Sequence, residues 1–168
     1  MYNYLKKGLF IMIVDNELIE HMANPNNYGR IEDADTIGIG ENPENGEKVI
    51  IYLNVIDQDR DFFIKEISFE AIACMTTVVA GSIITNEAKE ITFSKAEELI
   101  AVTLGMLEQV PPEQAACSEM VAVALKAAMD GYIASKASKD KQTLIYKIEQ
   151  SCSVENEFSA VKKGEDSE

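Results

Sequence analysis

The sequence has no tryptophan and a single histidine, His21, and aromatic residues make up only 7% of its 168 residues. Apolar residues nevertheless account for 46% of the chain, so aliphatic side chains must build the core of a single domain. With one histidine beside an expected turn, no Ser/His/Asp triad can be assembled. A glycine-rich phosphate loop is also absent from the sequence.

Basic residues are scarce, with 15 Lys and Arg against 29 Asp and Glu, which gives a formal net charge of −14. A strongly acidic surface repels phosphate backbones, so we expect no nucleic-acid partner. Such a surface suits cations or basic protein partners.

Cysteines are few and widely spaced, at Cys74, Cys117 and Cys152. Three such residues do not make the disulfide framework of a small secreted protein, so we expect a reducing compartment, the cytoplasm. The apolar run at residues 8–14 meets Asp15 without a cleavage site for a signal peptide, and no run is long enough to cross a membrane.

The first half of the chain predicts a helix at residues 15–23, capped by Asp15, and then a turn at 24–29. β-Branched and alternating patterns predict strands at 34–40, 48–56 and 62–73, which are joined by polar loops. Strands in succession with short connections indicate an antiparallel meander.

Helical patterns follow at residues 75–87, 95–107 and 113–134. Ser94 is the expected N-cap of the second helix, with Glu97 in a capping box. Strands first and helices afterwards predict an α+β fold, a small three-stranded antiparallel sheet packed on one face by helices.

This fold defines a domain at residues 15–134, preceded by an N-terminal extension at 1–14 and followed by a polar C-terminal tail at 135–168. Within the tail, residues 139–150 predict a further helix through Leu144, Ile145 and Ile148. Beyond Ser151 the composition is typical of disorder.

Two of the cysteines lie where helices are expected to begin. Cys74 follows a predicted strand, and Cys117 comes five residues after Pro112. The positive end of a helix dipole favours the thiolate, which is the ligand that soft metals and iron–sulfur clusters require. The alternative is an ordinary buried cysteine without a functional role.

The sequence around these cysteines resembles the NifU N-terminal/IscU family over about residues 15–133. The family's His-x-x-Asn-Pro-x-Asn-x-Gly pattern is matched from His21 to Gly29, and its glycine–proline loop resembles residues 40–49. Its strand, cysteine and small-residue helix resemble residues 69–85. Its Pro-Pro, His-Cys-Ser and alanine-rich helix resemble residues 110–128.

The resemblance implies a scaffold on which a cysteine desulfurase delivers sulfur and a cluster is built for iron–sulfur client proteins. The family's ligands are three cysteines, an aspartate and a histidine. Here Cys74 and Cys117 are retained, Asn45 replaces the first cysteine, Glu47 replaces the aspartate and Ala116 replaces the histidine. The family's chaperone-recognition segment resembles residues 110–114, but its lysine is lost.

The expected ligands are therefore Cys74, Cys117, Glu47 and, weakly, Asn45, for iron, a labile [2Fe-2S] cluster or zinc. Four ligands are needed, so a homodimer sharing the site or Cys152 from the tail would have to complete it.

Two other functions stay open. One is a non-catalytic adaptor of the same fold that binds a desulfurase or a client without a cluster. The other is a thiol enzyme using Cys117, although Ala116 leaves that thiol without a neighbouring base. We favour the scaffold and assign no catalytic residue.

Overall fold

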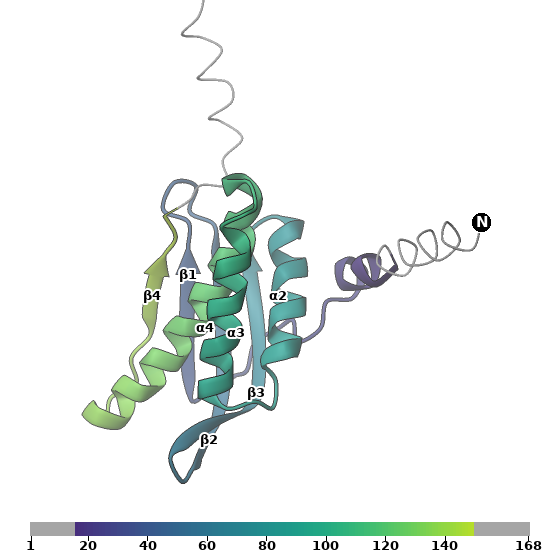
Figure 1. Ribbon diagram of the computed structural model, residues 1–168. Helices are drawn as coiled ribbons and strands as arrows, with labels where there is room; N and C mark the ends of the chain where they lie inside the picture. Colours follow the sequence, from purple (N-terminus) through teal and green to yellow (C-terminus); the bar gives the residue numbers. More distant parts are fainter. Residues whose placement is uncertain (1–15, 150–168) are drawn as a thin grey trace, which may run out of the picture.

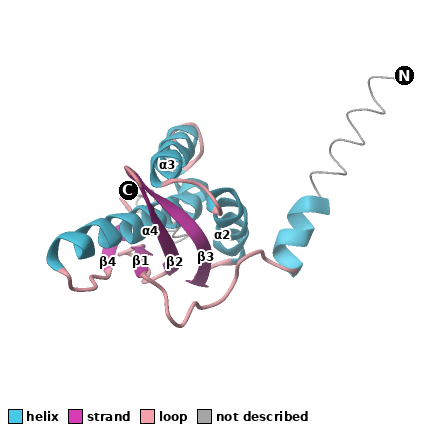
Figure 2. Ribbon diagram, turned by 90° about the horizontal axis from the view of Figure 1, so that it is seen from below, coloured by secondary structure: helices cyan, strands magenta, loops and turns pink. Residues whose placement is uncertain are grey.

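The computed structural model describes residues 16–149, which form two layers, a sheet and three helices that cover one of its faces (Figures 1 and 2). The strands are β1 (Thr36–Glu41), β2 (Lys48–Gln58), β3 (Asp61–Ile72) and β4 (Leu144–Lys147). The helices are α2 (Met75–Ala88), α3 (Phe93–Leu107) and α4 (Pro112–Ser138).

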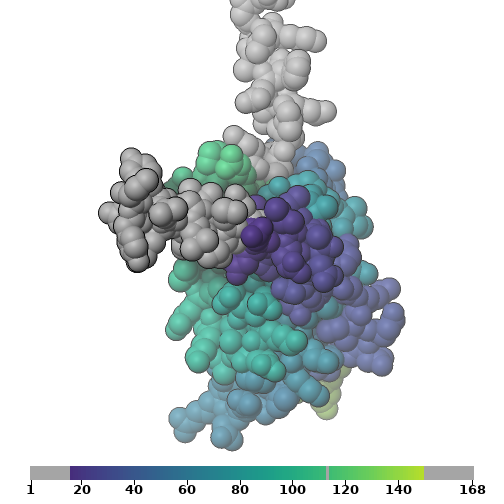
Figure 3. All heavy atoms as spheres, turned by 90° about the vertical axis from the view of Figure 1, so that its right-hand side faces the viewer, coloured from purple at the N-terminus to yellow at the C-terminus, as the bar shows by residue number. Residues whose placement is uncertain are grey.

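A further helical segment, residues 16–23, precedes the sheet, as the sequence predicts. Asn26 and Asn27, which follow this segment, donate hydrogen bonds to Ser82 and Thr85 of α2. Figure 3 shows the surface of this part of the molecule. The predicted cap Asp15, the N-terminal extension and Cys152 lie outside the described residues.

The sheet has the strand order β3-β2-β1-β4 within the described part of the chain. The predicted meander is confirmed, since β1, β2 and β3 pair antiparallel. The prediction of three strands is wrong, because β4 adds a fourth strand parallel to β1 and makes the sheet mixed.

The predicted helix within residues 139–150 is also wrong, since these residues supply β4. The side chains of Leu144 and Tyr146 are half-buried, Ile145 between them is exposed, and Ile148 is buried. This alternation of buried and exposed positions has the period of a β-strand. The apolar run is too short for its sequence to distinguish a strand from a helix.

The core lies between the sheet and α4, whose Val121, Leu125 and Ala128 are fully buried. The helix rests directly on β1 because that strand presents glycines to it. A Cβ at Gly38 would collide with the backbone of Ala128, and one at Gly40 with the carbonyl oxygen of Met120. This close approach holds the first half of α4, with Cys117, against the sheet.

The start of α3 differs from the prediction. Its N-cap is Thr92, whose hydroxyl accepts a hydrogen bond from the Lys95 backbone N–H at 3.4 Å. The helix begins earlier than Ser94 because Phe93 is buried in the core. Glu97 forms no capping box and instead pairs with Lys126 of α4 at 2.6 Å.

Three connections meet at one end of the molecule, the upper end in Figure 1. They are the β1–β2 loop, the junction between β3 and α2, and the start of α4. The sequence motifs that carry the candidate ligands lie on these three connections. Among residues 16–149, no helix is both long and apolar enough to cross a membrane.

Candidate metal centre

The candidate centre is built around two cysteines that the fold brings together. Cys74 is the N-cap of α2, directly after β3, and Cys117 lies in the second turn of α4. Their Sγ atoms are 3.6 Å apart across 43 residues of sequence. The sequence places each thiol near a helix start, and the structure adds that the two thiols meet.

This separation fits two ligands of one metal ion. Metal–sulfur bonds of about 2.3 Å in a tetrahedral site place neighbouring sulfur atoms about 3.8 Å apart. The observed 3.6 Å between Cys74 and Cys117 is close to that edge. Two thiolates can therefore take one ion without rearrangement of the backbone.

The environment of Cys74 favours its thiolate. Partial burial raises the pKa of Cys74, but hydrogen bonds from the Thr77 hydroxyl and from the backbone of Thr77 and Thr76 outweigh it. The pKa is lowered overall, and the neighbouring Cys117 contributes to the same effect.

Thr77 belongs to the candidate centre, although the sequence does not single it out. It is fully buried, and its Oγ1 lies 3.5 Å from Cys74 Sγ. Its position in the sequence could have indicated this contact. A residue three positions after the N-cap of a helix lies on the same side as the N-cap side chain, so its hydroxyl can reach the cysteine sulfur.

The β1–β2 loop carries the other two predicted ligands. Asn45 Oδ1 accepts a hydrogen bond from the Glu47 backbone N–H at 2.9 Å, so its only suitable donor atom for a metal already serves the turn. By contrast, Glu47 Oε2 is buried and has no hydrogen-bond partner among the described residues. Such an oxygen costs free energy unless something pairs with it.

The loop does not close a ready-made site in this conformation. Among residues 16–149, no three His, Cys, Asp or Glu side chains lie near enough together to hold a metal ion. The structure thus brings Cys74 and Cys117 together and leaves Glu47 at a distance from them.

His21 and Ala116 contribute no ligand here. Ala116 is fully buried in the core. His21 Nδ1 lies 2.7 Å from Ser82 Oγ, which also accepts the Asn26 backbone N–H. With a rise of about 1.5 Å per helical residue, Ser82 lies about 12 Å along α2 from Cys74.

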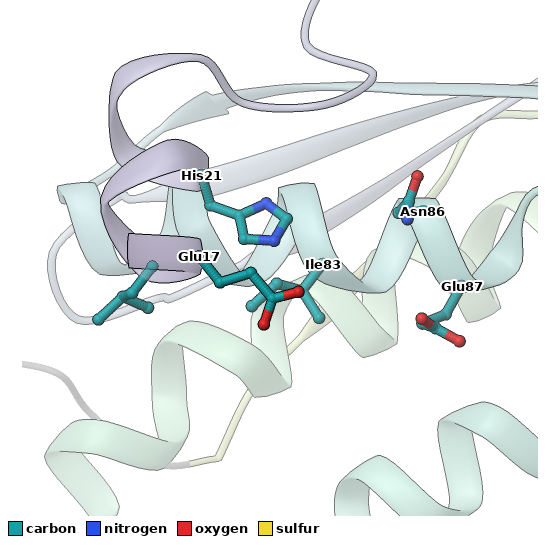
Figure 4. A pocket seen from close by; sticks show the side chains of 6 residues that line it. Glu17, His21, Ile83, Asn86 and Glu87 are labelled. Carbon is teal, nitrogen blue, oxygen red and sulfur yellow. The ribbon is translucent and has the colours of Figure 1, made fainter. Parts of the chain in front are cut away.

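A surface cavity of about 340 Å³ lies beside this histidine (Figure 4). Glu17 and His21 project into it from the first helical segment, and Ile83, Asn86 and Glu87 line it from α2. The cavity is separate from the cysteines, so it adds nothing to their ligand set.

An apolar groove of about 180 Å³ lies instead over the first turns of α2, the helix that Cys74 caps. It is lined by Leu18 and Met22 from the first helical segment and by Met75, Thr76 and Val79 from α2. Leu18, Met22 and Met75 are about half exposed. Exposed apolar side chains gathered in a groove are typical of a surface that meets another protein.

Comparison with known proteins gives consistent matches. The family model described as "NifU-like N terminal domain" matches residues 13–139. The Archaeoglobus fulgidus iron-sulfur cluster assembly scaffold protein IscU 1 is 30% identical over 154 residues, covering 89% of this chain and 92% of its own length. The Buchnera aphidicola scaffold protein IscU is 24% identical over 133 residues, with 77% and 99% covered.

Among solved structures, the chain is similar to a Fervidobacterium islandicum protein that is assigned as an iron-sulfur cluster assembly scaffold for the SUF system. The TM-score is 0.58 at 18% identity, and the match covers 67% of this chain and 93% of that one. At this identity the likeness concerns the α+β fold.

Proposed function

The chain belongs to the family of NifU-like N-terminal domains, and from this we propose that it is an iron–sulfur cluster assembly scaffold that holds iron through Cys74 and Cys117. One observation carries the proposal, the 3.6 Å separation of two thiols from different helices. Their spacing matches two ligands of one ion, and thiolates are the usual ligands of iron in clusters.

Iron or a labile [2Fe-2S] cluster is the cargo of this site, and zinc is an alternative occupant of the same thiols. Two cysteines are too few for a two-iron cluster, which takes four protein ligands. Glu47 is the third ligand that we propose, because its buried Oε2 lacks a partner among the described residues. The β1–β2 loop would have to move to bring this carboxylate to the two thiols. Asn45 is the weakest candidate, because its Oδ1 is engaged in the turn.

A second chain would supply the remaining ligands if two sites faced each other. The cysteines belong to the starts of α2 and α4, which lie at one end of the molecule (Figure 1). The proposed dimer would bring two such ends together. Measuring the mass in solution with and without metal tests this arrangement. A metal-dependent dimer is expected, and a monomer under both conditions would rule out a bridging cluster.

The proposed partners are a cysteine desulfurase, which brings sulfur, and iron–sulfur client proteins, which take the cluster. The apolar groove over the first turns of α2 supports contact with a protein at this end. The net charge of −14 favours partners with a basic surface. The chain holds cargo in this role, and we assign it no catalytic turnover.

Anaerobic reconstitution with iron, cysteine and a desulfurase tests the proposal. Bound iron and sulfide, measured with the visible charge-transfer bands, should appear in the unaltered chain and be lost in Cys74→Ser and Cys117→Ser. Since we propose that a second chain, and not Cys152, completes the site, Cys152→Ser is the matched control and should keep them. Bands that persist in both of the first two variants would refute the assignment of these ligands.

An adaptor without a cluster is the second candidate. It is favoured by the lack of any three-ligand group among the described residues and by the engaged side chain of Asn45. The same experiment separates the two functions. A colourless protein that still binds the desulfurase indicates the adaptor.

A further inference from the structure

The two cysteines differ sharply in their access to solvent. Cys74 is exposed, whereas Cys117 is only 2% exposed and lies behind it in α4. A sulfur donor from solution can therefore reach Cys74 and cannot reach Cys117 directly. The 3.6 Å between the two Sγ atoms nevertheless keeps the inner thiol in contact with the outer one.

This arrangement is close to the geometry of a displacement between sulfur atoms. Reacting atoms in productive conformers lie about 3–3.5 Å apart, and thiol–disulfide exchange proceeds by attack of a thiolate on a sulfur–sulfur bond. Within residues 16–149 these two are the only cysteines, so a disulfide in this part of the chain has one possible pairing.

We propose that Cys117 releases sulfide from a persulfide carried on Cys74. The inference rests on the proposed function in one respect, that sulfur arrives on the exposed thiol from a persulfide donor. Cys117 then resolves the persulfide within the same chain, and no iron takes part in the step.

The reaction balances without another oxidant or reductant. The Cys117 thiolate attacks Sγ of Cys74, and a bond forms between the two cysteine sulfurs. The bond from Cys74 Sγ to the outer sulfur breaks, and that sulfur leaves with the electron pair as hydrosulfide. The outer sulfur is reduced by two electrons, which the two cysteines supply by becoming a disulfide. A dithiol reductant afterwards restores both thiols and is itself oxidised to a disulfide.

Attack on the outer sulfur would instead move that atom to Cys117 without releasing sulfide. The burial of Cys117 disfavours this outcome, because a close-packed interior has little room for an added sulfur atom. The geometry therefore makes Cys74 the acceptor and Cys117 the resolving thiol.

The test uses the reduced, iron-free full chain and a small-molecule persulfide, with excess donor removed by desalting. Released sulfide is measured, and the intact mass is followed with time. We expect one sulfide per loaded chain. The intact mass should first rise by one sulfur atom and should then fall to two hydrogen atoms below the mass of the reduced protein. Peptide mapping should find a Cys74–Cys117 disulfide.

Cys117→Ser should retain sulfur on Cys74, with sulfide release at least about 100-fold slower, because an oriented internal thiol far exceeds a dissolved one in effective concentration. Cys117→Ala, which matches the neighbouring Ala115 and Ala116, serves if the serine variant folds poorly. Cys152→Ser is the matched control and should behave as the unaltered chain.

Two results would overturn the inference. One is sulfide release from both Cys117 variants at the unaltered rate, and the other is the absence of sulfur on Cys74 in those variants. Neither result bears on cluster binding, since the assay contains no iron. If the chain stays colourless in the reconstitution experiment, the sulfide-release assay can still be carried out and its result still tests this inference.

Discussion

The hydroxyl of Thr77 lies 3.5 Å from the sulfur of Cys74, inside the first turn of α2. Because Thr77 is fully buried, its hydroxyl has few other groups within reach for a hydrogen bond. The contact links the local sequence of one helix to the chemistry of the candidate centre.

Replacing Thr77 by valine should raise the pKa of Cys74. The substitution keeps the shape of the side chain and removes the hydroxyl that helps to lower this pKa. Since alkylation requires the thiolate, its rate at Cys74, followed by peptide mass spectrometry, should begin to rise at a higher pH in Thr77→Val.

Thr76→Val is the matched control, because Thr76 is exposed and acts on Cys74 through its backbone N–H, which the variant keeps. An equal displacement of the pH profile in both variants would show that the Thr77 hydroxyl is not the cause.

Replacing Glu47 by glutamine should weaken metal binding while sparing the fold. Loss of a group that supports a metal site typically lowers affinity about 10–100-fold, and loss of a direct ligand should cost at least as much. The free energy of unfolding of the metal-free chain should stay the same or rise, because the variant removes a carboxylate whose buried Oε2 lacks a partner among residues 16–149. Metal titration and denaturant unfolding measure the two effects.

Asn45→Ala provides the opposite pattern as a control. It removes the hydrogen bond from the Glu47 backbone N–H and should lower the free energy of unfolding by about 0.5–1.5 kcal/mol. Asn45→Ala should lower metal affinity less than Glu47→Gln does. Undiminished metal binding in Glu47→Gln would exclude this carboxylate as a ligand.

Gly40→Ala should displace α4 and weaken the site from a distance. The new methyl group would collide with the Met120 carbonyl oxygen, and overpacking of this kind costs about 1–3 kcal/mol. Metal affinity should fall as well, because α4 carries Cys117.

Gly105→Ala is the matched control for that substitution. Gly105 lies in α3 with open space around it, and alanine there should stabilise the protein by up to about 1 kcal/mol. Thermal unfolding of both variants checks the pair. Equal stability of the two would mean that β1 and α4 are not in the close contact described above.

The sequence was sufficient for most of the fold because its patterns are local. The alternation at residues 62–73 and the helical spacing after Pro112 predict β3 and α4, which the structure confirms. The strand β4 was missed because four residues in a polar segment carry too short a pattern, and their partner β1 lies about a hundred residues earlier. The cap of α3 was misplaced because burial of Phe93, a tertiary effect, fixes where that helix begins.

The sequence likewise predicts one part of the candidate site and not another. Each cysteine could be placed at a helix start from the residues around it. Their contact could not, because it depends on how α2 and α4 pack on the sheet, and on the glycines Gly40 and Gly81 that allow close packing. The burial of Cys117 behind Cys74 likewise follows from packing, and it determines which thiol a sulfur donor can reach.

The central claim, that Cys74 and Cys117 bind one metal ion together, is tested most directly by X-ray absorption on the zinc-loaded full chain. The number of sulfur neighbours at about 2.3 Å should be two per zinc in a monomer, or four where two chains share the ion. Cys74→Ser and Cys117→Ser should each lower this number, whereas Cys152→Ser should leave it unchanged. Zinc without sulfur neighbours, or the unaltered number in both Cys74→Ser and Cys117→Ser, would contradict the claim.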